Sequence, residues 1–288
     1  MIPCNPIQEA RTVKVGHMLM TDPKEGQGRN FDWRQFLAHA RTWGLQGVDL
    51  FPAYFERMGV GVEEAVSFIR WLGLDIPVYC VRTDLVSADR QVRQESLHRV
   101  RAAADDAEYL GVRHLFSYGG QHTHSGEEAF QRYVDGLRQA ADLCAERGLL
   151  FSIENAGSLC HTHEEIARCI EAVGRPNMRI TLDPGNLLLA GSDPHEAVRR
   201  LAPRVAHVHI KNFLDAPGRE PWPFRYCSPR AGKVDYAYVV EELRAVAYSG
   251  FLSFEPEGWP DAQADEGILY LDELLADAGA PEAQCRTR

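Results

Sequence analysis

The sequence lacks the patterns that identify several large classes of protein. No apolar run approaches the roughly 20 residues that span a bilayer, and none of the seven cysteines forms a CxxC pair. The GxGxxG loop of dinucleotide-binding sheets is absent as well, because the first predicted strand runs into GHMLMTDP. We therefore expect no transmembrane helix, no thiolate zinc site and no dinucleotide-binding fold, and we interpret the cysteines as free thiols in a reducing compartment.

Positive charge is also scarce. The chain has 31 lysines and arginines against 41 aspartates and glutamates, which gives a net charge of −10. Since a nucleic-acid surface needs clustered lysine and arginine, this balance argues against a nucleic-acid partner. The segment MIPCNPIQEARTVKV contains no basic flank followed by an apolar core, so no secretory signal is predicted. We expect a cytoplasmic protein without a membrane partner and leave homo-oligomerisation open.

Short β-rich runs alternate with longer amphipathic stretches along the whole chain. Strands are predicted at 13–19, 47–51, 77–83, 114–120, 149–155, 178–183, 205–212 and 251–257. Helices are predicted at 32–43, 62–72, 91–110, 127–147, 163–173, 194–201, 236–248 and 266–278. Several of the helical stretches end at a glycine, the residue preferred at the left-handed position after a helix: Gly44, Gly73, Gly111, Gly148, Gly174 and Gly250.

Eight such units in about 275 residues fit an α/β fold, the (β/α)8 or TIM barrel. No low-complexity linker divides the chain, so we predict a single TIM-barrel domain over residues 1–288. The longest irregular stretch, 212–234, follows the seventh predicted strand. We expect it to be a loop that folds over the catalytic face.

Four of the predicted strands carry, at their carboxyl ends, a side chain that suits a metal ion. These are Glu154 in LFSIEN, Asp183 in RITLDPGN, His209 in AHVHIKN and Glu255 in FLSFEPEG. Because the carboxyl ends of barrel strands meet at one face, we expect the four side chains to converge. Alternation along each strand turns the polar residues toward the barrel interior and the apolar residues toward the helices. The same alternation leaves His207 and Glu257 as competitors of His209 and Glu255.

Converging carboxylates repel each other strongly in a buried site unless a cation lies between them. Three carboxylates and one imidazole suit Mn²⁺, with Mg²⁺, Co²⁺ or Zn²⁺ as alternatives, whereas a structural zinc site would favour thiolates. We therefore predict one divalent metal ion as the cofactor. The alternative for Glu154 and Asp183 is a salt bridge or a helix cap.

The motifs IEN, LDPGN, HVHIKN and FLSFE, at the fifth to eighth strands in that order, resemble the xylose-isomerase-like superfamily of sugar isomerases and epimerases. The resemblance covers nearly the whole chain, from GVDLF, which contains Asp49, to AGKVDY. It implies that Glu154, Asp183, His209 and Glu255 bind one divalent metal ion. Likeness to the ketose epimerases further implies that Glu154 and Glu255 move the substrate proton.

Three positions depart from the pattern of that superfamily. Members commonly carry a histidine three residues after the metal-binding aspartate, and this chain has Asn186 there. They also commonly carry an aspartate directly after the HxK motif, where this chain has Asn212. Ketose 3-epimerases carry a second glutamate six residues after the first, and Cys160 takes that place here. The sequence thus indicates membership of the superfamily, but it does not single out the epimerase branch within it.

Further residues around the site are predicted to contact the substrate: Asn186, Lys211, His122, Glu257, Arg225 and Arg230. Lys211 is expected either to stabilise an oxyanion or phosphate, or to form a salt bridge with a ligand carboxylate. An aromatic wall is predicted from four residues, with core packing as the alternative: Tyr54, Phe55, Trp222 and Trp259. His161 and His163, beside a capping box of Thr162 and Glu165, are expected at the surface.

These residues favour a metal-dependent isomerase or epimerase of carbohydrate metabolism. It would act on a sugar or keto-sugar, phosphorylated or not, by proton transfer through a metal-bound enediolate, with Glu154 and Glu255 as the catalytic residues. Loss of a β-hydroxyl from the same enediolate would instead make it a dehydratase (lyase) of an inosose or keto-sugar. An AP-endonuclease-like phosphodiesterase, disfavoured by the acidic charge, and a non-catalytic barrel are further alternatives. The expected partner is a small polyhydroxy carbonyl compound.

Overall fold

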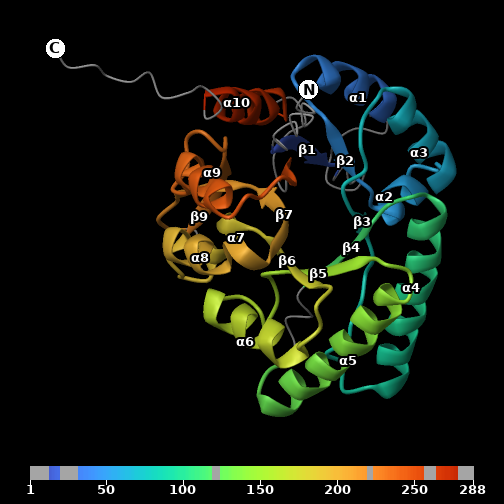
Figure 1. Ribbon diagram of the computed structural model, residues 1–288. Helices are drawn as coiled ribbons and strands as arrows, with labels where there is room; N and C mark the ends of the chain where they lie inside the picture. The colour runs from blue at the N-terminus through green and yellow to red at the C-terminus, as the bar shows by residue number, and fades with distance from the viewer. Residues whose placement is uncertain (1–12, 20–31, 119–123, 219–222, 256–263, 278–288) are drawn as a thin grey trace, which may run out of the picture.

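The computed structural model describes residues 13–19, 32–118, 124–218, 223–255 and 264–277. Eight strands form one parallel sheet in the order β2-β1-β10-β7-β6-β5-β4-β3. Parallel bridges from Gly47 to Asp75 and from Leu50 to Tyr79 join β2 to the β3 edge, so the sheet closes into a barrel (Figure 1). The strands are β1 Lys14–Met18, β2 Gly47–Asp49, β3 Tyr79–Cys80, β4 His114–Ser117, β5 Leu150–Glu154, β6 Met178–Leu182, β7 Val205–Ile210 and β10 Phe251–Phe254. The predicted (β/α)8 barrel is confirmed.

Helices surround the barrel on its outside (Figure 1). Those that overlap the predicted helices are α1 Trp33–Thr42, α3 Val62–Trp71, α4 Arg90–Tyr109, α5 Glu127–Ala145, α6 His163–Val173, α8 Pro194–Leu201, α9 Tyr236–Ala245 and α10 Ala264–Asp277. Three short elements were not predicted: the helices α2 (Pro52–Arg57) and α7 (Pro184–Leu189) and a 3-10 turn at Ala202–Arg204. Each is too short for a helical periodicity to be visible in the sequence. Within the described ranges, no helix is long and apolar enough to cross a membrane.

The barrel interior combines buried polar side chains with a small apolar cluster that includes Met18, Cys80 and Phe116, and the layer between barrel and helices is apolar. On β7, Val208 and Ile210 belong to the main hydrophobic core. The alternate residues His207 and His209 are equally buried, but they point across the barrel toward Asp49 on β2. The predicted alternation of polar and apolar faces is confirmed on this strand.

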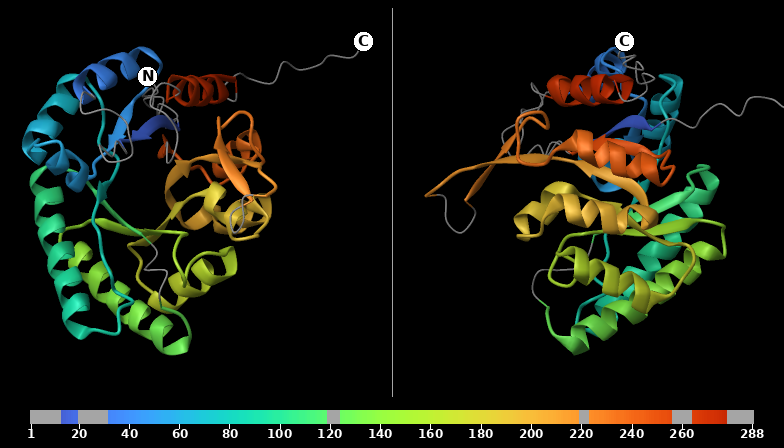
Figure 2. Two further views of the ribbon diagram at one scale, coloured as in Figure 1. Left: turned by 180° about the vertical axis from the view of Figure 1, so that it is seen from behind. Right: turned by 60° about the vertical axis from the view of Figure 1, so that its left-hand side comes forward.

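Residues 212–234 contain a β-hairpin, so their prediction as an irregular loop was wrong in part. Asn212–Asp215 (β8) pairs antiparallel with Phe224–Cys227 (β9), and the ribbon projects away from the barrel (Figure 2, right view, orange). Phe213 lies opposite Tyr226, with ring centroids 4.6 Å apart. Prolines and glycine between the two short strands hid their period-2 pattern from sequence reasoning.

Glycine ends most of the helices as expected, with one exception. Gly174 follows α6 in the left-handed region, at φ 63°, whereas Gly250 has no positive φ and Ala247, at φ 56°, takes the left-handed position after α9. The helix ends earlier than predicted, at Ala245. Gly250 is needed for another reason, since a Cβ there would lie 2.4 Å from the hydroxyl of Tyr248.

His17 on β1 is a buried histidine whose two ring nitrogens find no hydrogen-bond partner among the described residues. Its ring packs against Phe36 and Phe254, with centroids 5.1 and 5.9 Å away. Burial lowers the pKa of His17 to about 4, an effect that the charge of Asp49 partly offsets. The folded protein therefore holds His17 neutral.

We expect acid to destabilise the fold through His17. The unfolded chain binds this proton near pH 6.5, whereas folded His17 binds it only near pH 4, so stability is lost as the pH falls through that interval. The loss from this one group is up to about 1.4 kcal/mol per pH unit. His17→Phe removes the titration, so its free energy of unfolding, measured by urea denaturation across this interval, should fall less steeply than that of the wild type. Equal slopes for the two proteins would contradict this assignment.

Candidate metal centre

Three of the four predicted ligands form a compact group at the carboxyl end of the barrel. One ligand atom each of Glu154, His209 and Glu255 lies within 4.8 Å of the other two, and all three residues are buried. His209 Nδ1 is 3.0 Å from Glu154 Oε1 and 3.7 Å from Glu255 Oε2. Asp183 is buried at the end of β6 and is connected to this group through Lys211.

The LDPGN motif explains how Asp183 is held at the end of β6. Its Oδ1 accepts a hydrogen bond of 3.0 Å from the backbone N–H of Asn186, so that it caps α7, and Pro184 occupies the first turn. A Cβ on Gly185 would lie 2.7 Å from the carbonyl oxygen of Lys211, so this position must be glycine for β7 to approach. The capping role named as the alternative for Asp183 is thus observed, but it uses only one of the two carboxylate oxygens.

Asn155, the last residue of the IEN motif, joins the ends of β5 and β6. Its amide group donates to the carbonyl of Asp183 (2.8 Å) and accepts from the N–H of the same residue (2.7 Å). This paired bond fixes the backbone of Asp183 against that of Glu154. Sequence reasoning did not single out Asn155, although its place directly after a predicted ligand was a signal.

Lys211 places a positive charge between two of the carboxylates. Its Nζ lies 3.0 Å from Asp183 Oδ2 and 2.9 Å from Glu255 Oε2, with all three side chains buried. The salt bridge predicted as one of two roles for Lys211 is therefore present. Tyr236 holds the backbone of Lys211 through its hydroxyl, which accepts a 3.1 Å hydrogen bond from the N–H.

His207 and His209 have different surroundings, although they share one face of β7. His207 Nε2 is 2.9 Å from Asp49 Oδ2, deeper in the barrel. His209 reaches the carboxylate group with Nδ1, while its Nε2 is 3.4 Å from the same oxygen of Asp49. Of the two histidines, His209 is the one placed beside Glu154 and Glu255.

The crowding of acidic groups displaces pKa values at the site. Burial, opposed by Lys211 and aided by Glu154, raises the pKa of Asp183 to about 6. Burial lowers the pKa of His209, but the neighbouring Glu255, Asp49 and Glu154 outweigh it, and the pKa lies well above its usual value. Without a metal ion, the site thus takes up protons to balance its negative charge.

A cavity of about 490 Å³ opens directly above these side chains. Its lining includes Glu154, Glu255 and Lys211 together with Asn186, whose Nδ2 is 3.4 Å from Glu154 Oε1. Most of its remaining wall was not predicted: Tyr118, His161, Leu189, Phe213, Phe224 and Tyr226. Three of these aromatic residues come from the β8–β9 hairpin, whose strands were missed from the sequence.

The other predicted site residues lie in several places. Arg225 lines the cavity, whereas Arg230 is ion-paired with Glu273 and stacks on the ring of Tyr270, so a substrate contact by Arg230 has no support in the structure. Four of the predicted residues lie outside the described residues: His122, Glu257, Trp222 and Trp259.

The aromatic wall was predicted from the wrong residues as far as the structure describes them. Tyr54 packs in a small buried cluster with Phe51 and Phe116, and Phe55 belongs to the main core. The alternative of core packing is therefore observed for both. Their positions after β2, in the unpredicted helix α2, turn them away from the cavity lining.

The two histidines expected at the surface are not there. His163 is buried, with Nε2 3.0 Å from Glu164, and half-buried His161 lines the cavity. The capping box of Thr162 and Glu165 that follows His161 is confirmed. Its position in the loop after β5 was the signal that could have identified His161 as a site residue.

Two of the departures from the superfamily pattern have structural roles. Cys160 is fully buried in the core and does not line the cavity. The amide of buried Asn212 donates to the carbonyls of Pro229 (2.8 Å) and Val234 (2.9 Å), so it ties the end of the hairpin region to β8. A charged carboxylate at this position could not donate those bonds.

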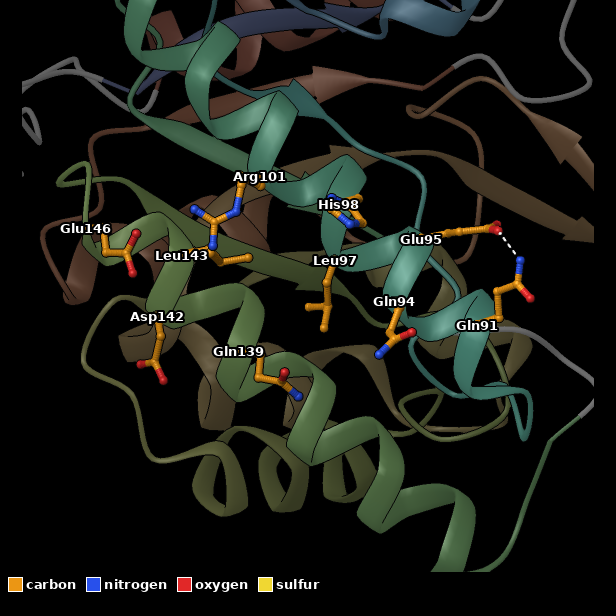
Figure 3. A pocket seen from close by; sticks show the side chains of 10 residues that line it. All are labelled: Gln91, Gln94, Glu95, Leu97, His98, Arg101, Gln139, Asp142, Leu143 and Glu146. Atoms are coloured by element: carbon orange, nitrogen blue, oxygen red, sulfur yellow. Dashed lines mark hydrogen bonds between the residues drawn. The ribbon is translucent and has the colours of Figure 1, made fainter.

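A broader hollow of about 620 Å³ lies on the outside of the barrel between α4 and α5 (Figure 3). Its side chains include Gln94, His98 and Gln139, and Asp142 at one end is paired with Arg175. None of the described residues there forms a carboxylate and histidine group that could hold a metal ion. The cavity above Glu154 is therefore the candidate site.

The closed parallel barrel defines a TIM-barrel protein, and the carboxylates and histidine at the carboxyl ends of its strands are side chains that could hold a metal ion. The model of the xylose isomerase-like TIM barrel family matches residues 37–274, and the chain belongs to this family.

Among curated proteins, the chain is 30% identical over 166 residues to an inosose dehydratase of Geobacillus kaustophilus, a match that covers 52% of this chain and 54% of that protein. The chain thus spans about half the length of that relative. An Escherichia coli protein with the provisional name L-ribulose-5-phosphate 3-epimerase is 24% identical over 84% of this chain and 89% of its own length. A 3-dehydroshikimate dehydratase of Bacillus anthracis is 24% identical over 82% of this chain and 74% of its own.

Solved structures show the same fold at low identity. A xylose isomerase-like TIM-barrel protein of Mycobacterium smegmatis, in complex with magnesium, has a TM-score of 0.71 at 18% identity and covers 94% of this chain and 99% of its own. The IOLI protein, with a bound zinc atom, has a TM-score of 0.74 at 15% identity over 93% of this chain and 100% of its own. Each of these two solved structures contains a divalent metal.

The side chains of this protein fit a divalent ion. The ligand atoms of Glu154, His209 and Glu255 lie within 4.8 Å of one another, and the buried Oδ2 of Asp183 has the Lys211 ammonium as its polar neighbour, at 3.0 Å. A single lysine leaves the charges of Glu154, Asp183 and Glu255 only partly balanced. Glu154, His209, Glu255 and Asp183 are therefore the residues that would hold the ion.

We expect Glu154→Gln and Asp183→Asn each to lower the affinity for Mn²⁺ by about 100-fold or more. Each substitution removes a charged ligand of the metal ion, whereas loss of a residue that only contacts a ligand typically costs about 10- to 100-fold. The measurement is metal content after dialysis together with calorimetric titration. Asp193→Asn is the matched control, since Asp193 caps α8 ahead of Pro194 just as Asp183 caps α7, but does not line the cavity. Full metal content in the Asp183 variant would contradict the assignment.

Metal binding is also expected to release protons. Asp183, with its pKa raised to about 6, and His209, with its pKa raised above the usual value, must lose their protons to act as ligands. The affinity should therefore fall as the pH drops through 6, by about tenfold per pH unit for each proton displaced. Calorimetry in buffers of different ionisation enthalpy measures the protons released. A pH-independent affinity between pH 7 and 5 would disprove this coupling.

Proposed function

We propose that this protein is a divalent-metal-dependent isomerase or epimerase of a polyhydroxy ketone, a sugar or keto-sugar. The observation that carries the proposal is the pair of buried glutamates, Glu154 and Glu255, which lie 3.0 and 3.7 Å from His209 Nδ1. Glu154 ends β5 and Glu255 directly follows β10, and these two strands are three places apart in the eight-stranded barrel. Two carboxylates so placed can reach a substrate from different sides.

In this proposal, a bound divalent ion would supply Lewis acidity toward the carbonyl and a neighbouring hydroxyl. Glu154 or Glu255 removes the proton from the carbon next to the carbonyl, and the other carboxylate returns a proton to the neighbouring carbon or to the opposite face. Lys211 lies beside both Glu255 and Asp183, where its charge stabilises an oxyanion that develops on the substrate.

The cavity wall supports a small polyhydroxy substrate. Asn186 and His161 offer hydrogen bonds for hydroxyl groups, and the aromatic rings of the hairpin offer a surface for the C–H face of a sugar. Arg225 at the same cavity would take an anionic group if the substrate is phosphorylated. Mn²⁺ remains the proposed ion, because three carboxylates and one imidazole suit it.

A dehydratase is the second candidate, favoured by the likeness to an inosose dehydratase and a 3-dehydroshikimate dehydratase. It needs the same first step at Glu154 or Glu255, followed by loss of a hydroxyl from the β-carbon. The phosphodiesterase alternative fits less well, since the two described groups of possible metal ligands share His209 and leave few donors for several zinc ions. The five described cysteines are free thiols, which supports a cytoplasmic location as part of the proposal.

The proposal predicts exchange of a substrate proton with solvent. With Mn²⁺ in D₂O, the wild type should introduce deuterium next to the carbonyl of one compound among ketoses, inososes and their phosphates, as read by NMR. Glu255→Gln at saturating metal should slow this exchange by about 10²- to 10⁴-fold. Arg230→Gln, which changes an arginine paired with Glu273 outside the cavity, should leave it unchanged.

The products of the same reaction separate the two candidates. Deuterium uptake without loss of water supports the isomerase or epimerase, and loss of water supports the dehydratase. If no polyol ketone exchanges, enediolate chemistry is ruled out for this site.

A further inference from the structure

We propose that Asp49 is a positioning residue for the metal centre, which orients His209 so that Nδ1 rather than Nε2 faces the ion. This inference rests on the metal site put forward above. Asp49 ends β2, far along the chain from every predicted ligand, and its side chain points into the barrel beneath them. It does not line the substrate cavity.

The contacts of the His209 ring point in two directions. Nδ1 faces Glu154 and Glu255, at 3.0 and 3.7 Å. Nε2 faces Asp49 Oδ2 at 3.4 Å, an ion-pair contact rather than a hydrogen bond, and this buried nitrogen has no hydrogen-bond partner among the described residues. Because an ionised carboxylate can only accept, Asp49 favours the tautomer with the proton on Nε2 and leaves the lone pair of Nδ1 for a ligand.

Asp49 is itself held in place. Ser253 Oγ donates to Asp49 Oδ1 at 2.9 Å, and His207 Nε2 is 2.9 Å from Oδ2. Ser253 lies directly beside His209 in the register of β10 and β7. All four residues are buried, so the orientation of the carboxylate is set by the barrel. His207 is thereby explained as a support of Asp49 rather than a rival ligand.

Outer contacts of this kind contribute to metal affinity by fixing the ring and raising its basicity. We expect Asp49→Asn to weaken binding of Mn²⁺ and Co²⁺ by about 10- to 100-fold in calorimetric titration. The visible absorption of the Co²⁺-loaded protein should shift, since it reports the ligand geometry. Enzyme turnover is not needed for either measurement.

His114→Asn is the matched control. His114 is another buried histidine inside the barrel, but its Nε2 is bonded to Ser152 Oγ at 2.7 Å. If Asp49 only stabilised the fold, both variants would lower thermal stability and neither would change metal affinity. We expect the affinity and the Co²⁺ spectrum to change in the Asp49 variant alone.

The possible failures are distinguishable. A wild type that binds no divalent ion would overturn the metal site and the proposed function with it. A wild type that binds and an Asp49→Asn protein that binds within about threefold of it would overturn only the role of Asp49. If that variant does not fold, Ser253→Ala removes one of the two bonds that hold Asp49, and unchanged affinity there would equally refute the inference.

Discussion

Repulsion between the buried carboxylates of Glu154, Asp183 and Glu255 is the interaction on which the arrangement of this site depends. Like charges in a low-dielectric interior cannot all persist without compensation. Among the described residues, Lys211 places a positive charge within 3.0 Å of both Asp183 and Glu255. Without a metal ion, the raised pKa of His209 keeps a proton there, and Asp183 takes up a proton as the pH falls through its pKa of about 6. A divalent ion would replace those protons with a positive charge that does not depend on pH. The proposed enediolate chemistry would use the same charge to stabilise the negative charge that develops on the substrate.

The backbone keeps these carboxylates together against their repulsion. Asp183 is fixed twice, by its cap on α7 and by the amide of Asn155 at the end of β5. Lys211 is fixed by Tyr236 from α9, and its carbonyl lies where any side chain on residue 185 would be. The contacts that hold the carboxylates thus come from several strands and helices of the barrel.

That Glu154, His209 and Glu255 lie together could be predicted from the sequence, because their positions follow from their places at the ends of strands. Once eight β–α units identify a barrel, a residue at the carboxyl end of a strand such as β5 or β6 must lie at the catalytic face. The alternation along the strand then decides whether its side chain points into the barrel or toward the helices. Alternation treats His207 and His209 alike, so the choice of His209 rested on its place nearer the carboxyl end of the strand and on the family resemblance. The structure gives the physical difference, which is the distance of each ring from Asp49 and Glu154.

The cavity wall could not be predicted in the same way, because it comes from segments without a regular period. Phe213, Phe224 and Tyr226 line the cavity only because two short strands pair antiparallel outside the barrel. His161 lines it because the loop after β5 turns back before the capping box of α6. Arg230, close to Arg225 in sequence, is instead held by Glu273 on α10.

The base of the cavity, formed by the carboxylates and His209, and its surrounding wall have different consequences for the choice of substrate. In the proposed function, Glu154, His209, Glu255 and Asp183 at the base of the cavity suit isomerisation, epimerisation and dehydration equally, since all three reactions begin with removal of the same proton. What differs between them is which carbon and which hydroxyl the wall presents to Glu154 and Glu255. In this chain, much of the wall belongs to the hairpin that Asn212 ties to the barrel through Pro229 and Val234. In the proposed function, Asn212 would therefore influence the choice of substrate through the position of the hairpin, without contacting the reacting atoms.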